Sequence, residues 1–314
     1  MMLLIVRKHK NNMCIHCKQK ELNAVNGLLD TFAQGKESKA RIADLSTCKS
    51  WGKTPPQTPY FDYSKLDKRV KTNKNKIAKV FKTWKKRFNE NYKNAQPFSL
   101  FAKAEELTLE VWQEVIAVGT VTNPTETSTV LIQLVGDEVV LSANEISKNL
   151  FELKGIITET ISEAPADVMD FLEIYEFNLS ESTASQVDIR LKNIVVNGMA
   201  NGDSSPDIAR QIRASFDTLS KDRALLIART ETIRASAEGS KTAYSRAGIE
   251  QVALLPAMDA CPVCMELASE NPYKVDDNAV YPPIHPNCRC AVVPVFDESD
   301  VQAISIGVVN SNSF

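Results

Sequence analysis

The chain has 314 residues, of which 43% are hydrophobic and 24% charged, and these are ordinary proportions for a globular protein with a substantial core. By the usual ~100–200 residues per domain the length predicts about two domains, and the 7% aromatic content argues against disorder throughout. The most apolar window, Val130–Leu141, is interrupted by Asp137 and Glu138, and it falls short of the ~20 apolar residues of a membrane span. We therefore expect no membrane partner.

The N-terminus has the wrong polarity for a secretory signal. Its apolar run, residues 1–6, precedes Arg7, Lys8 and Lys10, whereas a signal carries its positive charges first and a longer apolar region after them. We expect no Sec export and synthesis in a reducing cytoplasm. In that compartment, paired cysteines indicate metal ligation before disulfides.

The formal net charge of −2 conceals a strong asymmetry along the chain. Through Lys103 there are 23 Lys/Arg and 7 Asp/Glu, a balance of +16, and from Ala104 onward there are 14 Lys/Arg and 32 Asp/Glu, a balance of −18. Two halves of opposite sign predict two surfaces that meet different partners.

The first segment, residues 1–60, is irregular in pattern and ends in a turn-rich stretch with Pro55, Pro56 and Pro59, so Trp51–Phe61 is interpreted as a linker. The segment contains a Cys-x-x-Cys motif. A small zinc knuckle is one hypothesis for its poorly spaced donors, which are Cys14, Cys17 and Cys48 with His9 or His16.

A basic helical region is predicted over residues 61–120. Apolar residues recur there at spacings of three, four and seven, which predicts one amphipathic helix from Ser64 to about Ala95 that ends before Pro97. A second helix is expected from Leu100 to about Ala117. The apolar stripe of the first helix is Val70, Ile77, Val80, Phe81, Trp84 and Phe88.

A central, mostly helical region is predicted over residues 121–182. The run Val130–Leu141 is ambiguous between strand and helix, because a short apolar run fits both. A helix capped by Ser142 or Asn144 is expected to reach about Ser162, and a further helix is expected over Pro165–Leu179.

A separate C-terminal domain is predicted over residues 183–300, followed by a flexible tail at 301–314. Three helices are expected in it: Thr183–Met199, a second that begins at Ser204 and Ser205 before Pro206, and a third from Ser220 to about Arg246 that Gly248 ends. The apolar runs 250–256 and 291–296 are suited to two strands that pair around a Cys/His cluster. The predicted fold is thus mainly α, with helical N-terminal and central regions followed by a small α+β C-terminal module.

The basic helix offers a candidate nucleic-acid surface. Twelve Lys/Arg lie between Lys65 and Lys93 against only Asp67 and Glu90, and such a face would bind phosphates in a salt-sensitive way that is independent of sequence. An acidic protein partner or a merely solvated face are the alternatives. The aromatic residues lie on the apolar stripe, which favours core packing over base stacking. The candidate phosphate-binding residues are Lys71, Lys74, Lys79, Lys82, Lys85, Lys86 and Arg87.

The Cys/His cluster is a candidate metal site. Cys261-Pro-Val-Cys264 forms a thiolate knuckle that can occupy two tetrahedral positions of one Zn²⁺, and the His-x-x-Cys at His285 and Cys288 can supply the second pair. Cys290 is a fifth candidate, which either replaces His285 or is not a ligand. Structural zinc is the favoured interpretation; knuckles without metal, disulfides formed later and a redox role are the alternatives. A catalytic zinc is disfavoured, because no His-x-Glu accompanies the cysteines as in zinc deaminases.

The motif Ala228-Arg229-Thr230-Glu231 lies on the predicted third helix beside an apolar stripe. We interpret Arg229 and Glu231 as a buried or half-buried ion pair that fixes helix packing. A catalytic role for Glu231 is disfavoured, because no nucleophile or base accompanies it in the sequence.

These motifs in their order resemble the phage Mu F-like head morphogenesis family. The resemblance rests on the helix with Ala228–Glu231, a strand, Cys-x-x-Cys, and then Pro283-x-His285-Pro286-x-Cys288-Arg289-Cys290, with a run-up that includes Gly202, Ser205, Ile212 and Arg223. It spans about Phe171 to Val295. The stretch between Cys264 and His285 contains no recognisable ligand.

The resemblance implies a minor head protein that acts in procapsid assembly and is present in few copies inside the head near the portal vertex. It implies portal and other capsid proteins as partners, with assembly in the host cytoplasm, and double-stranded DNA is a further candidate partner. A toxin-like or hydrolytic enzyme carried with the virion is the disfavoured alternative. The sequence has no Gly-rich phosphate loop, Gly-x-Ser-x-Gly or His-Glu-x-x-His motif.

Overall fold

A computed structural model describes residues 58, 60–96, 106–117, 119–257, 260–297 and 300 of the chain. The candidate zinc donors Cys14, Cys17 and Cys48 and the expected tail 301–314 lie outside these residues. The chain divides into two compact units. We call Tyr63–Ser142 with Ile161–Gly239 the helical unit, and Met1–Asp62, Ala143–Thr160 and Ser240–Phe314 the strand unit.

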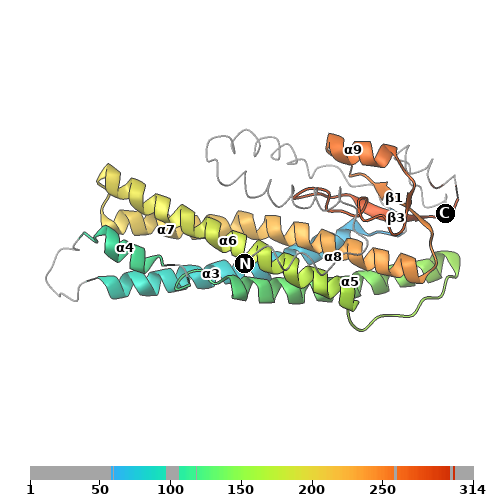
Figure 1. Ribbon diagram of the computed structural model, residues 1–314, viewed down its shortest axis with the longest axis horizontal. Helices are drawn as coiled ribbons and strands as arrows, with labels where there is room; N and C mark the ends of the chain where they lie inside the picture. Colours follow the sequence, from blue (N-terminus) through green and yellow to red (C-terminus); the bar gives the residue numbers. More distant parts are fainter. Residues whose placement is uncertain are drawn as a thin grey trace, which may run out of the picture. The chain divides into compact units, whose positions relative to one another are not determined.

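The helical unit consists of long helices that lie side by side (Figure 1). The predicted amphipathic helix is confirmed almost to the residue, and the helix expected from Leu100 begins later, at Leu109. The helices are α3 (Tyr63–Ala95), α4 (Leu109–Val115), α5 (Pro124–Lys154), α6 (Ala166–Asn201), α7 (Ser205–Thr218) and α8 (Ala224–Arg246), and α5 and α8 continue into the strand unit.

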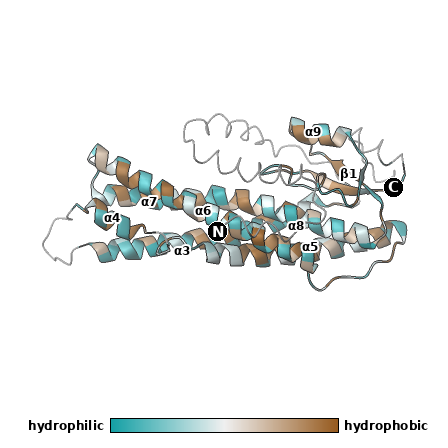
Figure 2. Cartoon of the chain, in the orientation of Figure 1, coloured by the Kyte–Doolittle hydropathy of each residue, from teal (hydrophilic) through white to brown (hydrophobic). Residues whose placement is uncertain are grey.

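One hydrophobic core holds these helices together. Trp84 and Phe88 of α3, Trp112 of α4 and Phe216 of α7 are fully buried in it, together with the apolar stripes of α5 and α6. Full burial of one such side chain is worth about 1.5–3 kcal/mol. Figure 2 shows hydrophobic and hydrophilic residues alternating along the long helices, as expected for helices with one buried face.

Two helix boundaries predicted from the sequence are wrong. The ambiguous run Val130–Leu141 and the helix expected after it form the single helix α5, which ends at Lys154. The two helices expected over 165–179 and 183–199 form the single helix α6, which ends at Gly202 in the left-handed conformation (φ 75°). Ser180 and Thr183, at the point where the two helices were expected to separate, lie on the buried face of α6.

The predicted cap of α7 is confirmed. The Ser204 hydroxyl accepts a hydrogen bond from the backbone N–H of Asp207, and Pro206 lies in the first turn. The helix expected to begin at Ser220 has no separate start, because it continues from α7. A π-helical turn, η2 (Leu219–Arg223), joins α7 directly to α8.

The strand unit contains a three-stranded antiparallel sheet. The two predicted strands are β1 (Gln251–Leu255) and β3 (Ala291–Val295), and they pair as expected, with Ala253 opposite Val293. A two-residue strand, β2 (Tyr273–Lys274), pairs on the other edge of β1, so the order is β2-β1-β3. The helix α9 (Pro262–Ser269), which the sequence did not predict, packs against β1. The predicted fold class, mainly α with a small C-terminal sheet, is confirmed.

Candidate metal centre and basic helix

The structure brings the five predicted metal donors together in the strand unit. The donors form two sets of three, and within each set the donor atoms lie within 4.8 Å of one another. The sets are Cys261, Cys264 and His285, and Cys264, Cys288 and Cys290. Cys264 belongs to both sets, and its Sγ lies 3.9 Å from that of Cys288. The thiols of Cys264, Cys288 and Cys290 are buried, and all four cysteines are free of disulfides.

The first two donors sit at the start of α9. Cys261 is the N-cap residue, Pro262 occupies the first helical position and Cys264 lies in the first turn. Proline is compatible with this position because its φ is already helical and no backbone N–H is needed there. The tight turn of the knuckle therefore comes from a helix N-terminus, whose dipole favours thiolate over thiol.

The other donors come from the segment before β3. The backbone N–H of Cys288 donates to the carbonyl of His285 (3.1 Å), and Asn287 between them has φ 64°, so the chain turns sharply. The Nδ1 atom of His285 lies 2.8 Å from the Pro286 carbonyl. Because a carbonyl can only accept, Nδ1 carries the proton in this contact, which leaves the Nε2 lone pair of the neutral ring for a metal.

A second interaction fixes the segment after α9. The Asn271 side chain accepts from the backbone N–H of Leu254 (2.8 Å) and donates to its carbonyl (3.0 Å), which continues the sheet's hydrogen bonding with a side-chain amide. No motif in the sequence points to Asn271. This residue ties the chain that leaves the knuckle to the central strand.

The electrostatics of the cluster favour the thiolate form most strongly at Cys288. Hydrogen bonds from Cys264 and Cys290 hold the pKa of the Cys288 thiol well below its ordinary value, although burial opposes this. A hydrogen bond to Cys288 raises the pKa of His285 to about 9. Donation to Cys288 raises the pKa of Cys264, and the pKa of Cys290 rises to about 12 because its contact with Cys288 and burial outweigh the lowering by Cys264. Cys264 and Cys290 therefore need added positive charge to ionise. Burial opposes ionisation of Cys261 as well, but hydrogen bonds with Cys264 and the nearby His285 lower its pKa.

This donor set fits a structural Zn²⁺. Zinc takes four sulfur and nitrogen donors, and a Zn–S distance of about 2.3 Å places two ligand sulfurs about 3.8 Å apart in a tetrahedron. The Cys264–Cys288 separation of 3.9 Å is close to that edge. Zinc would also supply the positive charge that several neighbouring thiolates require. The cluster can therefore bind a metal ion, and the buried sulfurs favour a closed site.

The basic helix is α3, and internal ion pairs engage part of it. Among the predicted phosphate-binding residues, Lys85 pairs with Asp217, Lys86 with Glu90 and Arg87 with Glu126. The structure gives no acidic partner within the described residues to Lys71, Lys74, Lys79 and Lys82; of these four, only Lys74 is half-buried. Val80, Phe81, Trp84 and Phe88 are buried, as the apolar stripe predicted.

The Arg229–Glu231 ion pair predicted from the sequence is wrong. Glu231 is 1% exposed and instead pairs with Arg234 (3.1 Å), because residues two apart on a helix point to opposite sides whereas residues three apart are neighbours. Arg229 is half-buried, and the Thr230 hydroxyl donates to the Leu226 carbonyl. Arg234 also donates to the hydroxyl of Tyr175 (2.9 Å) and stacks on its ring.

The sequence also missed Glu176 of α6. It is fully buried beside Glu231, and neither of its oxygens meets a hydrogen-bond donor among the described residues. Burial and the neighbouring Glu231 raise its pKa well above the ordinary value, with Arg234 opposing. A proton shared between the two carboxyl groups is the arrangement that this environment favours.

Comparison with known proteins gives a family and a curated relative. Residues 190–293 match the family described as Phage Mu protein F like protein. An uncharacterized protein of Haemophilus influenzae (strain ATCC 51907 / DSM 11121 / KW20 / Rd) is 27% identical over 166 residues, which cover 50% of this chain and 36% of that protein. The chain thus spans about a third of that relative's length. No solved structure matches the chain.

The matched residues include most of the signature on which the resemblance was based. They contain the end of α6, the capped α7, the Arg229–Glu231 motif, the knuckle and the turn at His285–Cys290, in the expected order. None of the described helices has the length and apolar character of a bilayer-crossing segment. Residues 190–293, about a third of the chain, are therefore similar to the phage Mu F-like family.

Proposed function

We propose that the chain is a minor head protein that acts in phage head and procapsid assembly at the portal vertex, where it contacts portal and other capsid proteins inside the virion. The observation that carries the proposal is the family match over residues 190–293, with its ordered motifs and converging cysteines. The role is structural rather than catalytic. Residues 183–300 act as the docking module, and assembly takes place in the host cytoplasm.

A structural zinc ion holds this module together. Cys261, Cys264, His285, Cys288 and Cys290 supply the four ligands, from a helix N-terminus and a loop about 20 residues further on. Such an ion contributes folding free energy directly, because the site does not exist in the unfolded chain. The ion would fix α9 against the strand that follows the second ligand pair, and so set the shape of the surface that partners meet.

Purified phage particles test the assembly role. Mass spectrometry of particles is expected to detect the chain, and a Cys264→Ser variant is expected to give fewer complete heads. A chain absent from the particles, with head yield unaffected by deletion of its gene, would refute the proposal. Neighbouring genes that encode a portal protein and a large terminase would support it.

Metal analysis of the full chain tests the zinc site separately. About one zinc per chain is expected, with loss of folded signal from the strand unit when a chelator removes it. A zinc content near zero, with folding unaffected by the chelator, would refute the structural zinc site and would leave the proposed assembly role unchanged.

A second candidate function is non-specific DNA binding by α3. The observation that favours it is the row of exposed lysines without acidic partners in the described structure, including Lys71, Lys79 and Lys82. These residues lie at spacings of eight and three and so on one side of the helix, which suits a line of phosphates.

Gel shifts with random duplex DNA across a salt series test this candidate. Neutralising Lys71, Lys79 and Lys82 is expected to weaken binding and to lower the salt slope by roughly one for each phosphate that the variant no longer binds. The matched control is Lys85→Gln, which removes a lysine that already has an internal partner. Equal losses for the row and for the control would refute the lysine row as the binding surface.

A further inference from the structure

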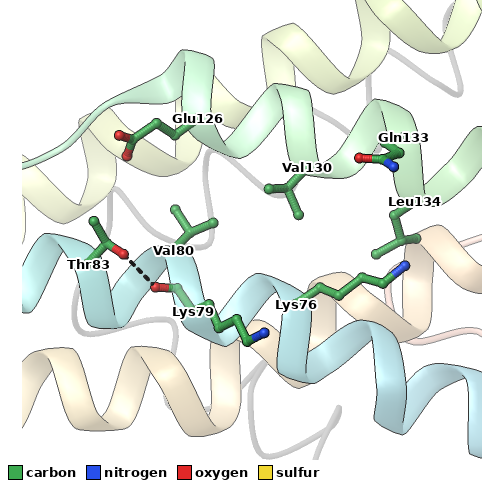
Figure 3. Close-up of a pocket in the computed structure, with 8 residues that line it drawn as sticks. All are labelled: Lys76, Lys79, Val80, Thr83, Glu126, Val130, Gln133 and Leu134. Atoms are coloured by element: carbon green, nitrogen blue, oxygen red, sulfur yellow. Dashed lines mark hydrogen bonds between the residues drawn. The ribbon is translucent and has the colours of Figure 1, made fainter.

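An open groove runs between α3 and α5 in the helical unit. Its volume is about 420 Å³, and Figure 3 shows the side chains that line it from the two helices. Val80, Val130 and Leu134 supply its apolar lining, and Lys76, Lys79 and Gln133 supply polar groups at its edges. A groove of this kind is suited to an amphipathic segment that fills the apolar part and pairs with the ammonium groups.

The charge of the groove is positive and unbalanced. Lys76 and Lys79 are exposed and have no acidic partner among the described residues. Glu126 also lines the groove, but Arg87 pairs with it through both carboxylate oxygens and so neutralises it. An occupant should therefore be acidic as well as partly apolar.

The same unit displays a helix face with these properties. On α6, Ile174 and Phe177 are 59% and 44% exposed although both are large and apolar. They lie between Asp170 and Glu181, which are exposed and without basic partners in the described structure. These four residues occur at spacings of four, three and four, so they share one side of the helix.

The sizes agree as well. At 1.5 Å per residue, the face from Asp170 to Glu181 is about 16 Å long. By the same rise, the lining of the groove from Lys76 to Thr83 covers about 11 Å of α3, and that from Glu126 to Leu134 covers about 12 Å of α5. The face thus exceeds the lining by about 4–5 Å in total, so an acidic side chain at one end of the face can lie beside Lys76 and Lys79.

We propose that the face of α6 formed by Asp170, Ile174, Phe177 and Glu181 docks into the α3–α5 groove of a second copy of this chain. Both surfaces belong to one compact unit and both are open in it, so one copy cannot satisfy its own groove. Duplex DNA is the weaker occupant, because it would pair with the lysines but leave Ile174 and Phe177 of α6 exposed to water.

The contact joins two different surfaces, so it is heterologous and each copy retains one free groove and one free face. The eight residues that line the groove and the four of the face are fewer than the roughly 20–30 residues a side of stable complexes. The association should therefore be concentration-dependent and should weaken with salt, since exposed charges contribute to it.

Charge reversal in the full chain tests the proposal. The groove variant Lys76→Glu/Lys79→Glu and the face variant Asp170→Lys/Glu181→Lys are each expected to lose self-association in sedimentation velocity. Mixing the two is expected to restore it, because each groove then meets a face of opposite charge. Misfolding cannot produce this pattern, since two unfolded variants do not recover on mixing.

The control variant Lys68→Glu/Lys93→Glu changes the same charge on exposed positions of α3 that do not line the groove, and it should associate like the unmodified chain. Several results would overturn the proposal. These are a monomeric unmodified chain at all concentrations, association that requires added DNA, variants that still associate, or a mixture that fails to recover.

Discussion

Two helical glycines provide a sharp test of the packing between the helices. A Cβ built on Gly198 of α6 would lie 2.6 Å from Cγ1 and 3.1 Å from Cδ1 of Ile208 on α7. A Cβ on Gly136 of α5 would lie 3.4 Å from Sδ of Met169, an ordinary contact with a flexible side chain. Replacing each glycine by alanine should therefore change stability in opposite directions.

The balance between helix propensity and overpacking sets the direction in which each substitution changes the stability. Alanine in a helix interior is favoured over glycine by roughly 0.5–1 kcal/mol, and Gly136→Ala should gain up to that amount. At Gly198 overpacking costs about 1–3 kcal/mol, because the clashing atom is the branch carbon of a residue with stiff χ1 and cannot swing away. The net expectation for Gly198→Ala is a loss of roughly 1–2 kcal/mol.

Thermal unfolding of the full chain, followed by circular dichroism, measures both effects. For a unit of this size 1 kcal/mol corresponds to about 2–4 °C in Tm. In the double variant Gly198→Ala/Ile208→Ala, the loss should be smaller than the sum of the single losses, because the clash is gone. A Gly198→Ala variant that is as stable as the unmodified chain, or more stable, would refute the close approach of α6 and α7.

Three further outcomes are expected. The pKa of Glu176 is raised in the folded protein, so its protonated carboxyl contributes fully to the free energy of unfolding below the unfolded pKa of about 4.5, and this contribution is lost as the pH rises above it. Glu176→Gln should make the free energy of unfolding depend less on pH in denaturant titrations. An unchanged pH dependence would contradict the buried carboxyl pair. Phe216→Ala should lose about 3–5 kcal/mol in the same titrations, because the ring is fully buried in the core; a loss below about 1 kcal/mol would contradict that burial. Cys264→Ser should abolish metal binding, since Cys264 belongs to both donor sets, whereas Cys290→Ser retains it if His285 is the fourth ligand; elemental analysis of the two purified variants distinguishes these cases.

The sequence predicted α3 well because a strict helical period, from Val70 to Phe88, leaves only one face for burial. It failed at α5 because Val130–Leu141 is apolar on several sides, and periodicity cannot then separate strand from helix. It failed at the middle of α6, where one helix was predicted to end at Leu179 and another to begin at Thr183, although Ser180 and Thr183 both face the core. Local polarity cannot reveal which face a distant helix will cover.

The candidate metal site was predictable because ligand chemistry restricts spacing more than packing does. The knuckle and the turn at His285–Cys288 were recognised as pairs, and the fold brings them together. The ion pair of Glu231 was misassigned because the sequence motif pointed to Arg229, although Arg234 is also near in sequence. Helix geometry selects Arg234, because it lies three residues from Glu231 on the predicted helix whereas Arg229 lies two residues away.

The π-turn η2 has a consequence for insertions and deletions in this region. One row of buried residues runs along α7, η2 and α8 at intervals of four, three, five, four and three. It consists of Ile212, Phe216, Leu219, Ala224, Ala228 and Glu231. The interval of five falls across the π-turn, which accommodates one extra residue without rotating the helix beyond it. Deleting one residue from Leu219–Arg223 would leave a continuous α-helix with Glu231 still in phase with the core. The same deletion within α8, before Glu231, would turn that carboxyl away by about 100°.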